Sequence, residues 1–363
     1  MTTLLIAGGG TGGHIYPAIA IAREYVARDA SRRVVFVGTQ KGLETQIVPK
    51  AGFPLELIDV GGLKGKGGAD LLRNLFRLPR GFAQAWSHVG KHRPNVVLGV
   101  GGYSSGPVLV AAKLRGVPTI IHEQNAFPGL TNRILARFTK AVAVAFADAL
   151  PRLKRTDGVV TGNPIRKEFF DLATHHKQPT TNNQQRLLLF GGSQGSRILN
   201  DTMSGALLFL ARLKDTLDIV HQTGPAELQK VRQAYSQSVF AKARVVSYLD
   251  PMADEIAAAD LVVSRAGAMT IGELAAVGRA SILVPFAAAT NNHQELNARV
   301  MERAGAAIVI TEKELTPEKL AAAISEVIGD RERVMRMGEA AKRTAVPEAT
   351  KNIVDLIERI QRN

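Results

Sequence analysis

Two short apolar runs in this chain each end at a glycine-rich turn that continues directly into a helical pattern. Leu4-Leu5-Ile6-Ala7 is followed by Gly8-Gly9-Gly10-Thr11-Gly12-Gly13-His14. Leu187-Leu188-Leu189-Phe190 is followed by Gly191-Gly192-Ser193-Gln194-Gly195-Ser196-Arg197. A strand that ends in glycines and opens a helix lets backbone N–H groups approach an anion, with the positive end of the helix dipole behind them. Two such turns, about a domain length apart, predict two Rossmann-like halves that face each other across a phosphorylated ligand.

The rest of the chain supports an α/β fold, because short β-branched runs alternate with helical patterns as in βαβ units on a parallel sheet. In the first half we expect strands at Val34–Val37, Leu55–Ile58, Val96–Val100, Thr119–His122 and Ala141–Ala145. In the second half we expect them at Leu187–Phe190, Ile219–Gln222, Arg244–Ser247, Leu261–Ser264, Ser281–Val284 and Ala306–Ile310.

The segments Gly162-Asn163-Pro164 and His175–Gln185 have the composition of linkers. The tail from Arg331 to Asn363 has a helical pattern broken at Pro347. We therefore expect an N-terminal domain over residues 1–164 and a C-terminal domain over 165–340. A helical tail over 341–363 is expected to pack back on the first domain.

The net charge of +14 and the pI near 10.1 are the unusual features of the composition. They predict an anionic partner, which the charge alone leaves open as nucleic acid, anionic lipid or a phosphorylated substrate. The chain contains no cysteine, which excludes disulfides and Cys-ligated metals. We find no pattern typical of a signal peptide or a membrane-spanning segment.

The first turn also satisfies the dinucleotide pattern G-x-G-x-x-G, so a nicotinamide or flavin enzyme has to be considered. That class needs an acidic residue at the end of the second strand, where this chain has Val37-Gly38-Thr39. A phosphate-binding P-loop is absent, since no glycine-lysine pair precedes Ser or Thr. No Asp-x-Asp pair occurs either, so we expect no divalent metal at the diphosphate.

Several polar residues follow predicted strands, at the edge where open α/β sheets bind ligands. His14 comes just after the first glycine turn and is our candidate general base, with a helix-capping role as the alternative. The cluster His122-Glu123-Gln124-Asn125 ends another strand, and Glu123 is the reserve candidate for the base.

In the second half, Ser264–Glu273 follows a strand and enters a helix. Glu273 could accept hydrogen bonds from a ribose diol, or it could be an ordinary solvated glutamate. The run Thr290-Asn291-Asn292-His293-Gln294 likewise follows a strand.

The segment from Gly61 to Pro94 combines basic and apolar residues. Its basic residues are Lys64, Lys66, Arg73, Arg77, Arg80, Lys91 and Arg93. Its apolar residues include Leu71, Leu72, Leu75, Phe76, Leu78, Phe82 and Trp86. Such a segment favours shallow insertion into an anionic membrane surface, although an ordinary amphipathic core helix would show a similar pattern. Nucleic acid is disfavoured, because the chain has no recognised nucleic-acid motif and few aromatic residues.

Six motifs together resemble the MurG family of bacterial glycosyltransferases. They are Gly9–His14, Gly101–Pro107, His122–Asn125, Gly162–Arg166, Gly191–Gly195 and Ser264–Ala268, in the same order along nearly the whole chain. The loop Ala287 to Asn292 has a looser pattern than its neighbours.

The resemblance implies a GT-B fold, with two Rossmann-like parallel-sheet domains and an interdomain cleft. It also implies an inverting, metal-independent transfer of N-acetylglucosamine, without a cofactor, from UDP-N-acetylglucosamine to the 4-hydroxyl of undecaprenyl-pyrophosphoryl-N-acetylmuramoyl-pentapeptide. This step belongs to peptidoglycan synthesis, at the cytoplasmic face of the bacterial inner membrane. The rival classes are a soluble glycosyltransferase with a small acceptor and a non-enzymatic nucleotide-binding module.

The resemblance also implies substrate-binding positions. In the C-terminal half these are Arg166, Ser193, Leu249, Ala268, Met269, Thr270, Ile271, Gly272, Glu273 and Gln294. From the N-terminal half, Thr11, Gly12, Gly13 and Asn125 are expected to close over the sugar and diphosphate.

Overall fold

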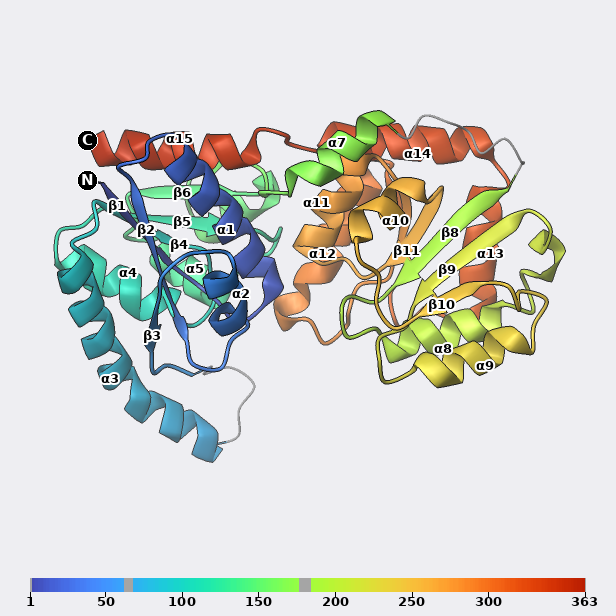
Figure 1. Cartoon of the computed structure of the whole chain (residues 1–363), viewed down its shortest axis with the longest axis horizontal. Helices are drawn as coiled ribbons and strands as arrows, with labels where there is room; N and C mark the ends of the chain where they lie inside the picture. The colour runs from blue at the N-terminus through green and yellow to red at the C-terminus, as the bar shows by residue number, and fades with distance from the viewer. Residues whose placement is uncertain (1, 62–67, 176–183, 363) are drawn as a thin grey trace. The chain divides into compact units, whose positions relative to one another are not determined.

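The computed structural model describes residues 2–61, 68–175 and 184–362. At 68–76 and 173–175 it describes the backbone alone. Two compact units make up the chain. The first comprises Met1–Ile165 together with Glu348–Asn363, and the second comprises Arg166–Pro347. Each unit is a parallel β-sheet with helices packed on it (Figure 1).

The first unit contains a seven-stranded parallel sheet in the order β3-β2-β1-β4-β5-β6-β7. Its strands are β1 (Thr3–Ala7), β2 (Arg33–Thr39), β3 (Leu55–Ile58), β4 (Val96–Gly99), β5 (Thr119–Glu123), β6 (Ala141–Val144) and β7 (Val159–Val160). The strands expected from the sequence are confirmed, with small shifts at their ends. The additional strand β7 consists of two exposed residues, too short to leave a pattern in the sequence.

Helices cover both faces of this sheet. They are α1 (Gly12–Ala27), α2 (Glu44–Lys50), α3 (Gly68–His92), α4 (Ser105–Leu114), α5 (Leu130–Leu135), α6 (Leu150–Leu153) and α15 (Ala349–Arg362), with the short 3-10 turn η1 (Ala147–Ala149). Leu4 and Ile6 of β1 face the core formed with α1 and α15, whereas Leu5 and Ala7 face the core formed with α3 and α4. The strand is apolar throughout because both of its faces are buried.

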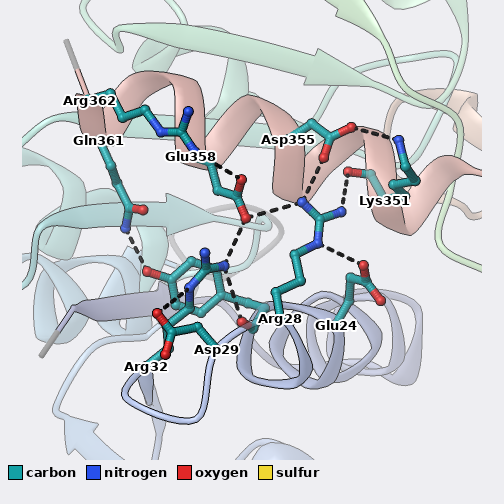
Figure 2. Close-up of polar contacts among 10 residues, drawn as sticks. Glu24, Arg28, Asp29, Arg32, Lys351, Asp355, Glu358, Gln361 and Arg362 are labelled. Carbon is teal, nitrogen blue, oxygen red and sulfur yellow. Dashed lines mark hydrogen bonds and ion pairs between the residues drawn. The ribbon is translucent and has the colours of Figure 1, made fainter.

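The C-terminal helix α15 returns to the first unit and packs along α1. Figure 2 shows the polar side of this contact, where Arg28, the C-cap residue of α1, lies between two acidic residues of α15. Its guanidinium is 2.6 Å from Asp355 Oδ1 and 3.1 Å from Glu358 Oε1. Arg32 adds a second contact to Glu358 at 2.8 Å. The predicted break at Pro347 is confirmed, since it separates α15 from α14 (Arg331–Thr344), which belongs to the second unit.

The second unit contains a six-stranded parallel sheet in the order β10-β9-β8-β11-β12-β13. Its strands are β8 (Gln185–Phe190), β9 (Leu217–Gln222), β10 (Arg244–Val246), β11 (Leu261–Ser264), β12 (Ala280–Leu283) and β13 (Ala307–Val309). Besides α14, its helices are α7 (Lys167–His175), α8 (Arg197–Ala206), α9 (Leu228–Ser236), α10 (Met252–Ala258), α11 (Ala268–Val277), α12 (His293–Arg303) and α13 (Pro317–Ile328), with the 3-10 turns η2 (Ala211–Leu213) and η3 (Thr290–Asn292). All six strands expected from the sequence are present.

Of the two segments with linker composition, the structure describes the first in full. Residues 161–165 are all buried in the first unit, where the carbonyl of Gly162 faces the ring of buried His122 at 3.1 Å. Composition was misleading here because a hydrogen-bonded backbone can be buried whatever its side chains. Most of the second segment, residues 176–183, lies outside the described residues.

Candidate active site

Each sheet has one point at which the strand order reverses. The chain moves outward from β1 to β3 and then returns to place β4 on the other side of β1, and the second unit does the same with β8 and β11. Open α/β sheets bind ligands outside the carboxyl ends of the strands at such points. The two glycine turns follow β1 and β8, so each lies at the switch point of its own unit.

The first glycine turn is organised by Glu44, a buried residue at the start of α2. Its Oε2 accepts a hydrogen bond from the N–H of Gly10 at 2.8 Å, and its Oε1 accepts from the N–H and the hydroxyl of Thr39 at 2.8 and 2.9 Å. A Cβ atom on Gly9 or Gly42 would lie 2.2 or 1.8 Å from this carboxylate. These glycines therefore leave space for the Glu44 carboxylate. Glu44 was not among the site residues predicted from the sequence.

His14 lies in the first turn of α1, with Nδ1 3.2 Å from the carbonyl oxygen of Gly9 and 3.4 Å from Thr11 Oγ1. A carbonyl oxygen can only accept a hydrogen bond, so contact with Gly9 favours the tautomer with the proton on Nδ1. The neutral ring then presents a lone pair at Nε2. That atom points toward the loop after β4, where it lies 3.0 Å from the position of a Cβ on Gly101.

Glu123 ends β5 and is buried, with both carboxylate oxygens hydrogen-bonded. Oε1 accepts from the backbone N–H and the side-chain amide of Asn125, at 3.0 and 3.2 Å. Oε2 accepts from the N–H of Gly129 and the amide of Asn132, at 3.0 and 2.9 Å. These four donors make Glu123 the organiser of the loop that carries Asn125.

His122, next to Glu123, is fully buried, and burial lowers its pKa to about 4. Gln124 donates to its Nδ1 at 3.2 Å, so Nε2 carries the proton and donates to Gly162 at 3.1 Å. His122 is therefore neutral near pH 7 and ties β5 to residues 161–165.

The second glycine turn is held in part by the neutral side chain of Gln222. Gln222, at the end of β9, donates from Nε2 to the carbonyl of Gly192 at 3.0 Å, while its Oε1 accepts from the N–H of Leu249 at 2.9 Å. The structure thus brings buried Leu249 to the loop that carries Ser193, whose own side chain is exposed.

Arg265 connects this turn with the segment after β11. Its guanidinium donates to the hydroxyl of Ser196, the N-cap residue of α8, at 2.8 Å and to the carbonyl of Val284 at 3.2 Å. Glu312 pairs with the same guanidinium at 2.6 Å. The positive charge of Arg265 behind the second turn is therefore balanced by the carboxylate of Glu312.

Gln294 joins the segments after β11 and β12. Its Oε1 accepts from the N–H of Ala266 at 3.3 Å and from the N–H of Phe286 at 3.0 Å. The helix α11 begins directly after this point. Its first N–H groups, at Ala268, Met269 and Thr270, have no acceptor within the helix because of their position.

Glu273 lies farther along α11, after Ile271 and Gly272, with its side chain only 14% exposed. Burial raises its pKa to about 7, even though the Arg166 guanidinium lies 3.7 Å away. Arg166 also pairs with Glu168 at 2.9 Å and lies over the ring of Phe169. A partly buried carboxylate with a raised pKa, beside an arginine at a strand-end loop, is typical of a binding site.

The basic segment expected at the membrane lies largely on α3. Lys64 and Lys66 fall outside the described residues, as do the side chains of Arg73, Leu71, Leu72, Leu75 and Phe76. Of the remainder, Arg80 has a 73% exposed side chain and Arg77 is half-buried beside Asp59. Trp86 is 38% exposed and packs against Phe82, with the Arg115 guanidinium 4.1 Å from its ring centre.

Comparison with known proteins decides the family. Residues 4–144 match the glycosyltransferase family 28 N-terminal domain, and residues 186–353 match its C-terminal domain. The UDP-N-acetylglucosamine--N-acetylmuramyl-(pentapeptide) pyrophosphoryl-undecaprenol N-acetylglucosamine transferase of Myxococcus xanthus is 47% identical, over 98% of this chain and 92% of its own. The crystal structure of Acinetobacter baumannii MurG superposes with a TM-score of 0.82 at 29% identity, covering 99% of this chain and 100% of that one. This chain belongs to the MurG family.

Other members are equally well covered. The enzyme of the same name from Syntrophotalea carbinolica is 45% identical over 99% of this chain and 98% of its own. Membership in the MurG family and the two parallel sheets confirm the GT-B class expected from the sequence. The nicotinamide or flavin enzyme considered from the first turn alone is thereby set aside.

Proposed function

We propose that this chain transfers N-acetylglucosamine from UDP-N-acetylglucosamine to an undecaprenyl-pyrophosphoryl-linked N-acetylmuramoyl-pentapeptide. The observation that carries this proposal is the match, over nearly the whole chain, to relatives named for that transfer. The reaction forms a glycosidic bond at the acceptor hydroxyl and releases UDP, so the site must activate a hydroxyl and stabilise a leaving diphosphate.

The second unit would bind the donor. Glu273 would accept hydrogen bonds from the ribose hydroxyls, which its low exposure and the neighbouring Arg166 support. The first turn of α11 suits the diphosphate because it is a helix N-terminus, and so does the exposed turn at Ser193 because it leads into the N-terminus of α8. Gln294 and Leu249 would hold the surrounding loops in place.

The first unit would act on the acceptor, with His14 as general base. Its hydrogen bond to Gly9 favours a lone pair on Nε2, the form that can take a proton from a hydroxyl. Glu123 is less suited to this role because its oxygens already accept four hydrogen bonds from the chain. We assign Glu123 the positioning of Asn125, which together with Thr11, Gly12 and Gly13 would contact the sugar and diphosphate.

Direct attack by the acceptor hydroxyl would invert the anomeric centre and give a β linkage. The charge of the leaving diphosphate would be taken by helix N-termini and Arg166 rather than by a divalent ion.

Transfer of labelled N-acetylglucosamine to a lipid-linked muramoyl-pentapeptide in detergent tests the proposal directly. We expect product with this acceptor and none with the same sugar-peptide lacking the pyrophosphoryl lipid. Efficient transfer to a small lipid-free acceptor alone would contradict the proposal and favour a soluble glycosyltransferase.

We further propose that the chain works at an anionic membrane surface, on the cytoplasmic face of the bacterial inner membrane. None of the helices in the described part of the chain is long and apolar enough to cross a membrane. The basic residues of α3 and the overall charge of +14 support attraction to anionic headgroups.

Replacing Arg73, Arg77 and Arg80 together by glutamine tests this attachment. Each basic side chain near an anionic surface contributes about 1 kcal/mol, so vesicle binding should fall strongly while UDP affinity is unchanged. Removing equal charge elsewhere, at Arg331, Arg336 and Arg343, is the matched control. Equal loss in both triple variants, measured by sedimentation with anionic vesicles, would show that net charge rather than α3 determines binding.

A further inference from the structure

One group of metal-ligating side chains in the described part of the chain lies outside the residues assigned to transfer. It consists of Glu56 on β3 and His88 and His92 on α3, each offering a ligand atom within 4.8 Å of the others. The two histidines are four residues apart on a helix, so they share one face of α3. Their side chains are 19% and 5% exposed, and that of Glu56 is 22% exposed.

The orientation of His88 is set by the backbone of β3. Its Nε2 lies 3.2 Å from the carbonyl oxygen of Leu57, which can only accept, so this nitrogen carries the proton. In the neutral ring, Nδ1 then has a lone pair, and it faces Glu56 Oε2 at 3.5 Å. A ring nitrogen and a carboxylate oxygen that face each other in this way can share a cation, which is either a proton or a metal ion.

The same carboxylate receives a second imidazole. His92 Nε2 lies 2.7 Å from Glu56 Oε1. Lys91 also reaches Oε1, at 2.8 Å. The lysine that competes with a metal ion for this oxygen has a 62% exposed side chain on a flexible stem.

We propose that Glu56, His88 and His92 bind one zinc-class divalent transition-metal ion, which joins α3 to the edge strand β3. Two imidazoles and a carboxylate are a known zinc ligand set, with bonds of about 2.0–2.2 Å. Tetrahedral ligands at such bond lengths lie about 3.3 Å apart. The distances from the Glu56 oxygens to the two imidazoles, 2.7 and 3.5 Å, lie on either side of that value, and the three ligand atoms all lie within 4.8 Å of one another. The Leu57 carbonyl supplies the outer hydrogen bond that metal-bound histidines almost always make.

Such an ion would have a structural role. β3 is the edge strand of its sheet and is separated from β1 by β2, and none of the three ligands belongs to the residues proposed for transfer. The ion would instead fix the helix that carries Arg77 and Arg80. Zinc would displace the proton between His92 and Glu56, so binding would release a proton and weaken at low pH.

Zinc titration of the full chain without a histidine tag, in competition with a chromophoric chelator, tests the proposal. We expect one site per chain and a higher melting temperature with zinc. His88→Ala and His92→Ala should each weaken binding at least about tenfold and abolish the thermal shift. Cobalt in place of zinc should give the visible absorption of a tetrahedral site.

Lys91→Ala is the discriminating control, because it keeps all three ligands and removes the competing ammonium group. Zinc should bind this variant more tightly than the wild type. If neither histidine variant alters zinc binding, or if the wild type binds no zinc at micromolar concentrations, the proposal is wrong. Unchanged circular dichroism of the variants without metal shows that a lost site is not a lost fold.

Discussion

The two glycine turns have the same local pattern but different electrostatic surroundings. The first is backed by Glu44, whose carboxylate accepts the N–H of Gly10 and has no cation within ion-pair distance in the described part of the chain. The second is backed by the neutral amide of Gln222 and by Arg265, which is itself paired with Glu312. A buried negative charge therefore lies behind the first turn, and a balanced pair lies behind the second.

This difference indicates which turn suits which task. A carboxylate a few ångströms from the first turn makes it a weaker diphosphate site than the second turn, since like charges repel strongly where water is excluded. The second turn lacks this obstacle and adds a guanidinium on the N-cap of α8. The comparison therefore supports a nucleotide diphosphate in the second unit and hydroxyl chemistry, through His14, in the first.

His14→Ala should give the largest effect. A positioned general base contributes about 10²–10⁴-fold, so turnover should fall by that factor. UDP affinity should change little if the donor binds in the second unit. Near-normal turnover in this variant, with an inactive Glu123→Gln, would transfer the role of base to Glu123.

Glu44→Ala should mainly cost stability. It removes a buried carboxylate that accepts three hydrogen bonds, which we expect to lower the free energy of unfolding by about 2–4 kcal/mol. Gln222→Ala removes neutral hydrogen bonds and should cost about 1–2 kcal/mol. Urea unfolding, followed separately in each unit, measures the loss in free energy of unfolding for both variants. Equal costs would contradict the claim that charge distinguishes the two turns.

Glu273→Ala should weaken UDP binding by about 1.5–3 kcal/mol, the contribution of hydrogen bonds to a charged group. Because burial raises the pKa of Glu273 to about 7, the ionised form that accepts best from a diol becomes populated only as pH rises. Wild-type affinity should therefore increase between pH 6 and 8, while Glu273→Gln should show no such increase. Titration calorimetry at several pH values decides this.

The raised pKa of Glu273 also predicts how the stability of the second unit depends on pH. A raised pKa in the folded state means that stability is present below the unfolded value and is lost as pH rises through about 7. Glu273→Gln should thus stabilise the second unit at pH 8 and much less at pH 4. An equal effect at both pH values would mean that the carboxylate is not held in a site that disfavours its charge.

Chelation of divalent metal ions should have the smallest effect on the rate of transfer. If helix N-termini and Arg166 take the diphosphate charge, transfer should persist in EDTA. The measurement is best made in the His88→Ala, His92→Ala background, which removes the zinc site proposed on α3. Loss of activity that magnesium or manganese restores would contradict metal-independent transfer.

The sequence by itself determined the strand–turn–helix units, most strand positions and the two switch-point turns. It could do so because these features depend on neighbours within a few residues: apolar runs buried on both sheet faces, glycines at the turn and helical periodicity after it. The break at Pro347 follows from the same local rule, since proline cannot continue a helix.

Only the tertiary structure decided which charged side chains lie behind these turns and which hydrogen bonds hold them. Glu44 acts on Gly10 across 34 residues, Arg265 reaches Ser196 across 69, and Asp355 of α15 meets Arg28 across 327. A single sequence carries no periodic signal for such pairs. The raised pKa of Glu273 likewise depends on burial, which arises only when the surrounding elements pack together.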